Sequence, residues 1–322
     1  MTTETVATRP GIDLARIRSW LPAYGVYAAI VVLVLYNVVF TPNFLAWGNL
    51  RIQLIQVAPI VIVALGMALV IGTEGIDLSV GSVMALAAAL IPLYLGYGVV
   101  AAIGVSLLAG AVVGLLNGVL VARVGLQPIV ATLALFVGGR GLALVISDGQ
   151  LKDIRNDDLI FLGSGDFLGL PMLVWIAALL VLIVAFVVRR TVFGRRLLAI
   201  GGNRPATELA GVPVKRVLIT VYVICSVLAS IAGLLAVARI QSSDASAVGL
   251  LIELSAITAV VVGGTPLTGG RVRVLGTVAG ALLMQLVIAT MIKHNLQSSI
   301  TEMVQAAIIL VAVYAARERK SR

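Results

Sequence analysis

Two carboxylates in the apolar part of this sequence are the side chains best suited to bind or move a polar solute. Glu74 and Asp77 stand in segment 72–82, which reads GTEGIDLSVGS and interrupts two apolar runs. An unpaired carboxylate is costly near hydrocarbon, so both must face protein, water or a transport pathway. Irregular backbone at membrane depth is tolerated only where it is buried or lines a cavity. The segment is therefore a candidate pathway element.

A second glycine-rich break, segment 263–270 with the sequence GGTPLTGG, follows a short apolar run. Paired broken segments in the two halves of a chain are the best sequence indication of a transport site. The alternative is that these glycines serve only close helix packing, and both interpretations can hold. The predicted pathway or gate set joins both breaks to two other intramembrane polar residues: Glu74, Gly75, Asp77, Ser79, Asn117, Glu253, Thr265 and Thr268.

Chemistry by the chain itself is not expected. Arg140 lies within an apolar run, where it should pair with a carboxylate or a backbone carbonyl and serve structure. The sequence has no G-x-x-x-x-G-K-[ST] loop, so it does not bind ATP by that route. A single His and a single Cys exclude the usual metal clusters and Cys–His dyads. We predict no catalytic residue, no metal and no cofactor.

The composition indicates an all-α polytopic membrane protein. Of the 322 residues, 61% are hydrophobic and only 11% are charged, whereas a soluble domain carries about a quarter charged residues. The mean hydropathy is +1.13. The apolar runs are long and unbroken, which favours helices over the short alternating segments of a β-barrel. The net charge of +9 comes without a basic stripe or stacked aromatics, so nucleic-acid binding is not expected.

Ten apolar runs are candidates to cross the bilayer as helices within a permease domain at 21–316. They fall at 21–40, 51–72, 76–97, 99–121, 127–147, 171–190, 217–239, 250–263, 275–293 and 299–315. Glycines interrupt or shorten two of them, 76–97 and 250–263. The fold prediction is therefore about ten transmembrane helices, some of them broken by glycine-rich segments.

The distribution of basic residues predicts the orientation. With segment 1–20 inside, seventeen of the 23 lysines and arginines lie on inside segments and five lie outside or at the outside borders. This bias requires an even number of spans, so both ends are predicted to be cytoplasmic, including the basic tail 317–322. The outer loop 147–170 either contacts a soluble receptor or is a solvated cap. We expect a multi-pass protein of the cytoplasmic (inner) membrane of a prokaryote.

The longest inside loop, 189–216, contains a short helix with clear boundaries. Asn203 is a good N-cap, Pro205 fits the first turn, and Gly211 followed by Pro213 ends the helix. The helix is either a solvated connector or a docking element for a cytoplasmic partner, because small apolar residues in a charged frame suit an interface. The predicted coupling residues are Gly201, Asn203, Arg204, Pro205, Ala206, Glu208, Leu209 and Gly211.

Four stretches of the sequence resemble one known family. They are GMALVIGTEGIDLSVGSVMAL (66–86), NGVLVARVGLQPIVATLALFVGGRGLA (117–143), FGRRLLAIGGNRPATELAGVPV (193–214) and ELSAITAVVVGGTPLTGGRVRVLGTVAGALL (253–283). Together they are similar to the permease subunits of ATP-binding-cassette (ABC) importers of monosaccharides, of the ribose, xylose and galactofuranose type. The likeness covers nearly the whole chain and keeps the order and spacing of the motifs.

The resemblance implies a set of partners. These are a second permease subunit, in a homodimer or heterodimer, a cytoplasmic ABC ATPase subunit and an extracytoplasmic sugar-binding protein, with membrane lipid around the bundle. A cytoplasmic helix after the sixth span couples to the ATPase in this family, which matches the helix that Asn203 begins. Two residues depart from the family pattern: Glu74 stands where glycine is common, and Ser255 stands where aspartate is common.

Two functions follow. The first is import of a neutral monosaccharide, galactofuranose-, galactose- or ribose-like, driven by a separate ATPase. The second is an ion- or proton-coupled secondary transporter of a small polar solute, built around Glu74, Asp77 and Arg140. The large basic inside loop and the lack of histidine relays favour the first.

Overall fold

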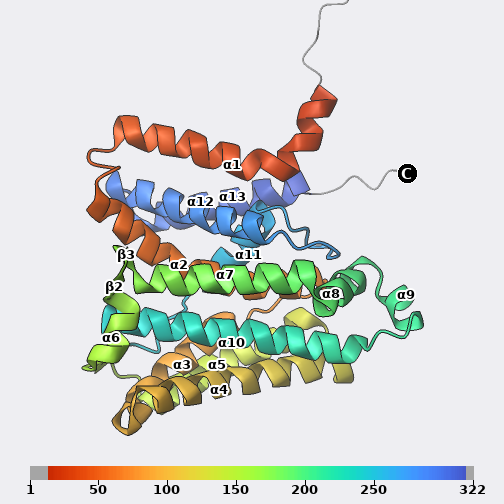
Figure 1. The fold of residues 1–322 in the computed structure, drawn as a ribbon, viewed down its shortest axis with the longest axis horizontal. Helices are drawn as coiled ribbons and strands as arrows, with labels where there is room; N and C mark the ends of the chain where they lie inside the picture. Colours follow the sequence, from red (N-terminus) through yellow and green to blue (C-terminus); the bar gives the residue numbers. More distant parts are fainter. Residues whose placement is uncertain (1–13, 317–322) are drawn as a thin grey trace, which may run out of the picture.

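The computed structural model describes residues 14–316, and in this part of the chain nearly all regular structure is helical. The helices run side by side along the long axis of the molecule (Figure 1). The long helices are α1 (Leu14–Phe40), α2 (Trp47–Gly72), α3 (Val80–Tyr94), α4 (Val99–Val119), α5 (Pro128–Ser147), α7 (Met172–Arg190), α10 (Val214–Ile240), α11 (Ile252–Val262), α12 (Val274–Lys293) and α13 (Ser298–Ala316). The short ones are η1 (Leu95–Tyr97), η2 (Leu120–Val124), α6 (Asp157–Ser164), α8 (Val192–Gly202) and α9 (Arg204–Leu209).

A helix occupies each of the ten apolar ranges that the sequence marks. Among the described residues, seven helices are long and apolar enough to cross a membrane, and two shorter apolar helices cover 25–40 and 252–262. In the two ranges that glycine interrupts, the helices are shorter than the ranges themselves. The range 76–97 yields a helix that begins only at Val80, and the range 250–263 yields one of 11 residues. The all-helical prediction is thus confirmed.

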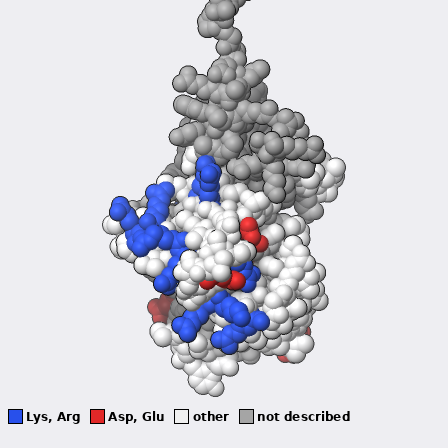
Figure 2. Space-filling model, turned by 90° about the vertical axis from the view of Figure 1, so that its right-hand side faces the viewer, with Lys and Arg blue, Asp and Glu red and all other residues white. Residues whose placement is uncertain are grey.

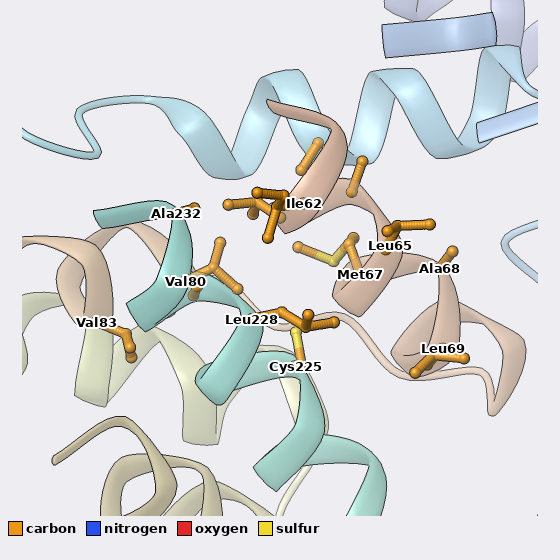
Figure 3. Close-up of a cluster of buried hydrophobic side chains, with 14 of the residues drawn as sticks. Ile62, Leu65, Met67, Ala68, Leu69, Val80, Val83, Cys225, Leu228 and Ala232 are labelled. Carbon is orange, nitrogen blue, oxygen red and sulfur yellow. The ribbon is translucent and has the colours of Figure 1, made fainter. Parts of the chain in front are cut away.

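Helices α2 and α10 form the centre of the bundle. In α2, 83% of the residues in the most apolar stretch are buried, against 17% in α5. The part of α2 from Val57 to Gly72 has no polar side chain, as expected for a helix that is surrounded by others. Figure 3 shows the core that results, where Ile62, Leu65 and Met67 of α2 lie beside Cys225 and Leu228 of α10.

Glycines let these central helices approach closely. A Cβ atom on Gly66 of α2 would lie 2.9 Å from the Cα atom of Cys225. On α4, a Cβ atom on Gly114 or on Gly118 would lie 2.7 Å from a Cα atom of α10. Without a hydrophobic effect between helices in lipid, such close van der Waals packing is a main source of association. Packing therefore explains many glycines of this chain outside the breaks.

The two ends of the bundle differ. At one end lie α8 and α9, and α1 begins and α13 ends on that side (Figure 1). At the other end, α6 and two short strand pairs cover the helices. Strand β1 (Lys152–Asp153) pairs antiparallel with β4 (Ser242–Ser243), and β2 (Asp166–Phe167) pairs with β3 (Leu170–Pro171). The loop 147–170 is thus tied to the segment that follows α10.

Two helices differ from the predicted segment bounds. The inside loop 189–216 was expected to hold one short helix, but it holds two, because the amphipathic stretch VFGRRLLAIGG forms α8 before α9. Segment 1–20 is predicted to precede the first membrane span at 21–40, and α1 begins within this segment, at Leu14. Residues 1–13 and the tail 317–322 lie outside the described residues.

Candidate translocation and coupling site

The first break, here residues 73–79, contains a series of buried, hydrogen-bonded polar side chains. Asp77 Oδ1 accepts hydrogen bonds from the backbone nitrogen of Ser79 at 2.9 Å and from its hydroxyl at 2.6 Å. The Nδ2 atom of Asn117, on α4, donates to the Ser79 hydroxyl at 2.8 Å. All three residues are fully buried. The structure therefore brings these three predicted residues together, as a link that fastens the break to α4.

The other carboxylate of this break has a different environment. Glu74 is exposed, and its backbone adopts the left-handed conformation with φ of 64°. The neighbouring Gly75 is buried, and a Cβ atom there would lie 2.7 Å from the Tyr222 hydroxyl. Glycine at this position lets the chain turn against α10 and leaves Glu74 on the surface. The two carboxylates predicted as one site thus face different surroundings.

The second break spans residues 263–273, between α11 and α12. Thr265 is buried, and its hydroxyl oxygen accepts a hydrogen bond from the backbone nitrogen of Arg273 at 3.0 Å. Thr268 is exposed. Three glycines of this break adopt positive φ, at 86° for Gly264, 74° for Gly269 and 76° for Gly270. The Thr265 hydroxyl therefore helps to hold the break, and its backbone path favours glycine.

The two breaks touch each other. The Gly270 backbone nitrogen donates a hydrogen bond of 3.1 Å to the carbonyl oxygen of Gly72, at the end of α2. A Cβ atom on Gly269 would lie 2.6 Å from Cγ of Glu74. The sequence predicted two paired breaks, and the structure places them in direct contact.

The end of α8 is wedged against both breaks at this point. A Cβ atom on Gly201 would overlap the carbonyl oxygen of Gly72 and would lie 2.5 Å from the Gly270 nitrogen. A Cβ atom on the following Gly202 would meet no heavy atom within 4 Å. Sequence reasoning placed Gly201 in the coupling loop but missed this contact, for which the glycine doublets at 201–202, 263–264 and 269–270 were the available signal.

Helix α9 is fastened to α8 and ends in an exposed leucine. The Asn203 side chain accepts a hydrogen bond from the Ala206 nitrogen at 3.0 Å, which confirms the predicted N-cap. The Thr207 hydroxyl donates to the carbonyl oxygen of Ala199 in α8, at 2.9 Å. Leu209, the last residue of α9, is 91% exposed. The predicted helix end is also found, since Gly211 follows with φ of 76°.

Basic side chains surround this end of the molecule. Figure 2 shows lysines and arginines spread over the face that carries α8 and α9, with few acidic side chains among them. Arg204 forms a salt bridge of 3.2 Å with Glu208 along α9. A basic surface of this kind is typical of the cytoplasmic side of a membrane protein.

Arg140 and Glu253 form a third group, beside Gly81 at the end of segment 72–82. The Arg140 Nη1 atom donates to the carbonyl oxygens of Ala245 at 2.9 Å and Val248 at 2.8 Å. These carbonyls belong to the loop 241–251 that follows α10, so backbone carbonyls are the partners of Arg140, as one of the two predicted options stated. Glu253 is buried in the first turn of α11, beside Gly81, and does not join the polar groups of either break.

Comparison with known proteins decides the family. Residues 49–313 match the family model described as a branched-chain amino acid transport system / permease component. The chain belongs to this permease family. It is also 38% identical to the ribose import permease protein RbsC of Escherichia coli (strain K12), over 97% of this chain and 98% of the relative.

Two further relatives of the permease are similar over most of their length. The galactofuranose transporter permease protein YtfT of Escherichia coli (strain K12) is 39% identical over 82% of this chain and 78% of its own length. The L-arabinose ABC transporter permease protein AraH of Azospirillum brasilense is 35% identical over 87% of this chain and 83% of its own length. No solved structure matches the chain significantly.

These findings confirm the resemblance stated from the motifs. The chain is a multi-pass permease of the cytoplasmic membrane, in the family of the permeases of ABC monosaccharide importers. The sugar import relatives are transport subunits rather than enzymes, in line with the expectation for this chain.

Proposed function

We propose that this permease is the membrane subunit of an ABC importer that moves a neutral monosaccharide, galactofuranose-, galactose- or ribose-like, into the cytoplasm. The contact of Gly201 with both breaks carries this proposal, because it joins a candidate docking loop directly to the two candidate gates. The names of the relatives support a sugar, since ribose, galactofuranose and L-arabinose all appear among them. The family description names amino acids, so the sugar rests on the relatives.

The orientation follows from charge. The basic face around α8 and α9 is cytoplasmic, in agreement with the positive-inside rule. Ten helices cross the membrane, the short α11 among them, and both termini are cytoplasmic. The beginning of α1 and the end of α13 lie on the side of α8 and α9, which supports an even number of crossings.

Energy for transport comes from a partner. A cytoplasmic ABC ATPase binds α9 through Leu209 and the basic residues around it, and its closure on ATP displaces α8. Gly201 then moves against Gly72 and Gly270, so that both breaks shift together. A second permease subunit and an extracytoplasmic sugar-binding protein complete the assembly. The polar residues at the breaks, Glu74 and Thr268 first among them because they are exposed, line the inner end of the pathway.

The secondary transporter is the weaker proposal. It needs Glu74, Asp77 and Arg140 to act on one ion. Asp77 is buried and accepts hydrogen bonds from Ser79, Glu74 is exposed, and Arg140 donates to loop carbonyls. No single site therefore contains all three.

Charge reversal at the α8–α9 end tests the proposal. The triple variant Arg195→Glu, Arg196→Glu, Arg204→Glu should bind the ATPase poorly and separate ATP hydrolysis from sugar uptake, because docking charges are reversed outside the packed bundle. Sugar uptake and ATP hydrolysis are measured in vesicles that contain the permease, its ATPase and its sugar-binding protein. A second set of vesicles lacks the ATPase. Lys152→Glu with Arg155→Glu, at the other end, is the matched control for association with the ATPase.

Three results discriminate. The proposal is supported if uptake requires the ATPase, survives a proton ionophore and falls in the triple variant, while the control binds the ATPase as the wild type does. Normal uptake and normal ATPase association in the triple variant would refute the docking role. Uptake by the permease alone that collapses with the ionophore would establish the secondary transporter instead.

A further inference from the structure

A cavity of about 370 Å³ lies between α2, α10 and the loop 241–251, at the end of the molecule where β1 and β4 pair. Its wall is mostly apolar and includes Pro59, Ile60 and Met84. Small-molecule sites typically measure about 300–1,000 Å³ and combine apolar walls with a few placed polar groups. None of the predicted pathway residues lines this cavity.

Arg239 is the cationic group of the cavity. It stands in the last turn of α10 and is only partly buried. Among residues 14–316, no salt bridge or side-chain hydrogen bond engages its guanidinium. A partly desolvated guanidinium with five unused donors is well suited to hold the oxygens of a ligand.

Three further polar side chains line the same cavity. Asp244 Oδ1 is fixed by the Ser246 nitrogen at 2.8 Å and hydroxyl at 2.5 Å, and the Ser246 hydroxyl holds the pKa of Asp244 below its ordinary value. The Ser242 hydroxyl is buried and has no hydrogen-bond partner within the described part of the chain. Gln56 Oε1 accepts from Gln285 at 2.7 Å, which leaves the Gln56 amide nitrogen as a donor toward the cavity.

From this arrangement we propose that the cavity is a binding site for one neutral monosaccharide on its way from the outer side into the permease. Sugar hydroxyls both donate and accept, so they can donate to the Asp244 carboxylate and accept from Arg239 and Gln56. The C–H faces of the ring fit the apolar wall. One cation and one carboxylate give a lining without net charge, which disfavours an anionic phosphate or a metal cation. The inference rests on the proposed function, because it assigns the sugar a place within this subunit.

One wall of the cavity is tightly packed. Gly249 stands there with φ of 72°, and a Cβ atom on it would lie 2.5 Å from the Gly81 carbonyl oxygen and 2.9 Å from Cβ of Met84. Arg140 holds this loop in place through the carbonyl oxygens of Ala245 and Val248. We therefore expect that passage of the sugar beyond the cavity requires a displacement of loop 241–251.

Equilibrium binding to the purified permease in nanodiscs tests the site, with radiolabelled D-ribose, D-galactose, D-fructose and L-arabinose as the probes. At least one sugar should bind the wild type, and Arg239→Gln or Asp244→Asn should weaken it at least about tenfold, because each removes a charged hydrogen-bond partner of a hydroxyl. Arg155→Gln is the matched control, since that side chain is 90% exposed at the same end. Its affinity should equal that of the wild type.

A thiol-protection measurement covers the case in which these variants fold poorly. In a Cys225→Ser background, Ala247→Cys, an exposed position in the cavity wall, should react with a maleimide more slowly when the sugar is present. Tyr97→Cys, 82% exposed and outside the cavity, should show no protection. Three results would each overturn the inference: no probe sugar binds, both cavity variants bind as the wild type does, or the cavity holds a phospholipid that Arg239→Gln releases. If the cavity variants show ATP-driven uptake with unaltered kinetics, the inference fails and the proposed function stands. If the wild type shows no ATP-driven uptake of sugar, the proposed function itself is refuted.

Discussion

The two glycine-rich breaks share a sequence pattern but differ in what holds them. The first is held by side chains, since Asp77, Ser79 and Asn117 form a buried chain to α4. In the second, three glycines adopt positive φ and the buried Thr265 hydroxyl accepts a hydrogen bond from the Arg273 backbone. The difference teaches that a broken helix in an apolar sequence marks where the chain can bend, whereas burial decides whether its polar groups anchor it or face solvent.

Removal of the Asp77 carboxylate should sharpen this comparison with the largest effect on stability. Asp77→Ala leaves the buried N–H and O–H of Ser79 without their acceptor, which should lower the free energy of unfolding by about 2–4 kcal/mol. Glu74→Ala, in the same break but exposed, should change it by less than about 0.5 kcal/mol. Thermal unfolding of the detergent-solubilised permeases measures both.

An Asp77→Ala permease as stable as the wild type would show that the hydrogen bonds of Asp77 do not anchor the first break. A large loss in Glu74→Ala would show that its carboxylate has a structural partner in the assembly.

A smaller effect is expected in the second break. Thr265→Val keeps the side-chain shape but removes the acceptor of the Arg273 backbone N–H, which should cost about 1–2 kcal/mol. Thr268→Val, exposed in the same break, serves as the control and should be neutral for stability. The same unfolding assay applies, and equal stability of the two variants would mean that the backbone alone holds this break.

Much of the fold could be predicted from the sequence, because lipid imposes long apolar helices and a basic inner face. The helix at Arg204–Leu209 was predictable as well, since its Asn203 cap and its Gly211 end are local signals. Helix α8 was missed because its amphipathic stretch is short and lies between basic residues, so it read as a loop.

The site was predictable only in part. Residue types identified the polar groups near both breaks, but contacts between distant segments do not follow from local pattern. Nothing local distinguishes Gly201, where a Cβ atom would collide with Gly72 and Gly270, from Gly202, where a Cβ atom would meet no heavy atom within 4 Å. Likewise Arg239 and Asp244 read as ordinary boundary charges, and only the tertiary structure places them around one cavity.

The ratio of sugar transported to ATP hydrolysed in reconstituted vesicles tests whether Gly201 links the ATPase to both breaks. Gly201→Ala inserts a methyl group against Gly72 and Gly270, and such overpacking should disturb the contact while α9 still binds the ATPase. We predict that ATP hydrolysis continues while the ratio falls at least about tenfold, which corresponds to roughly 1.4 kcal/mol of lost coupling. Gly202→Ala, with open space around it, should keep the wild-type ratio. A folded Gly201→Ala permease with the wild-type ratio would contradict the account.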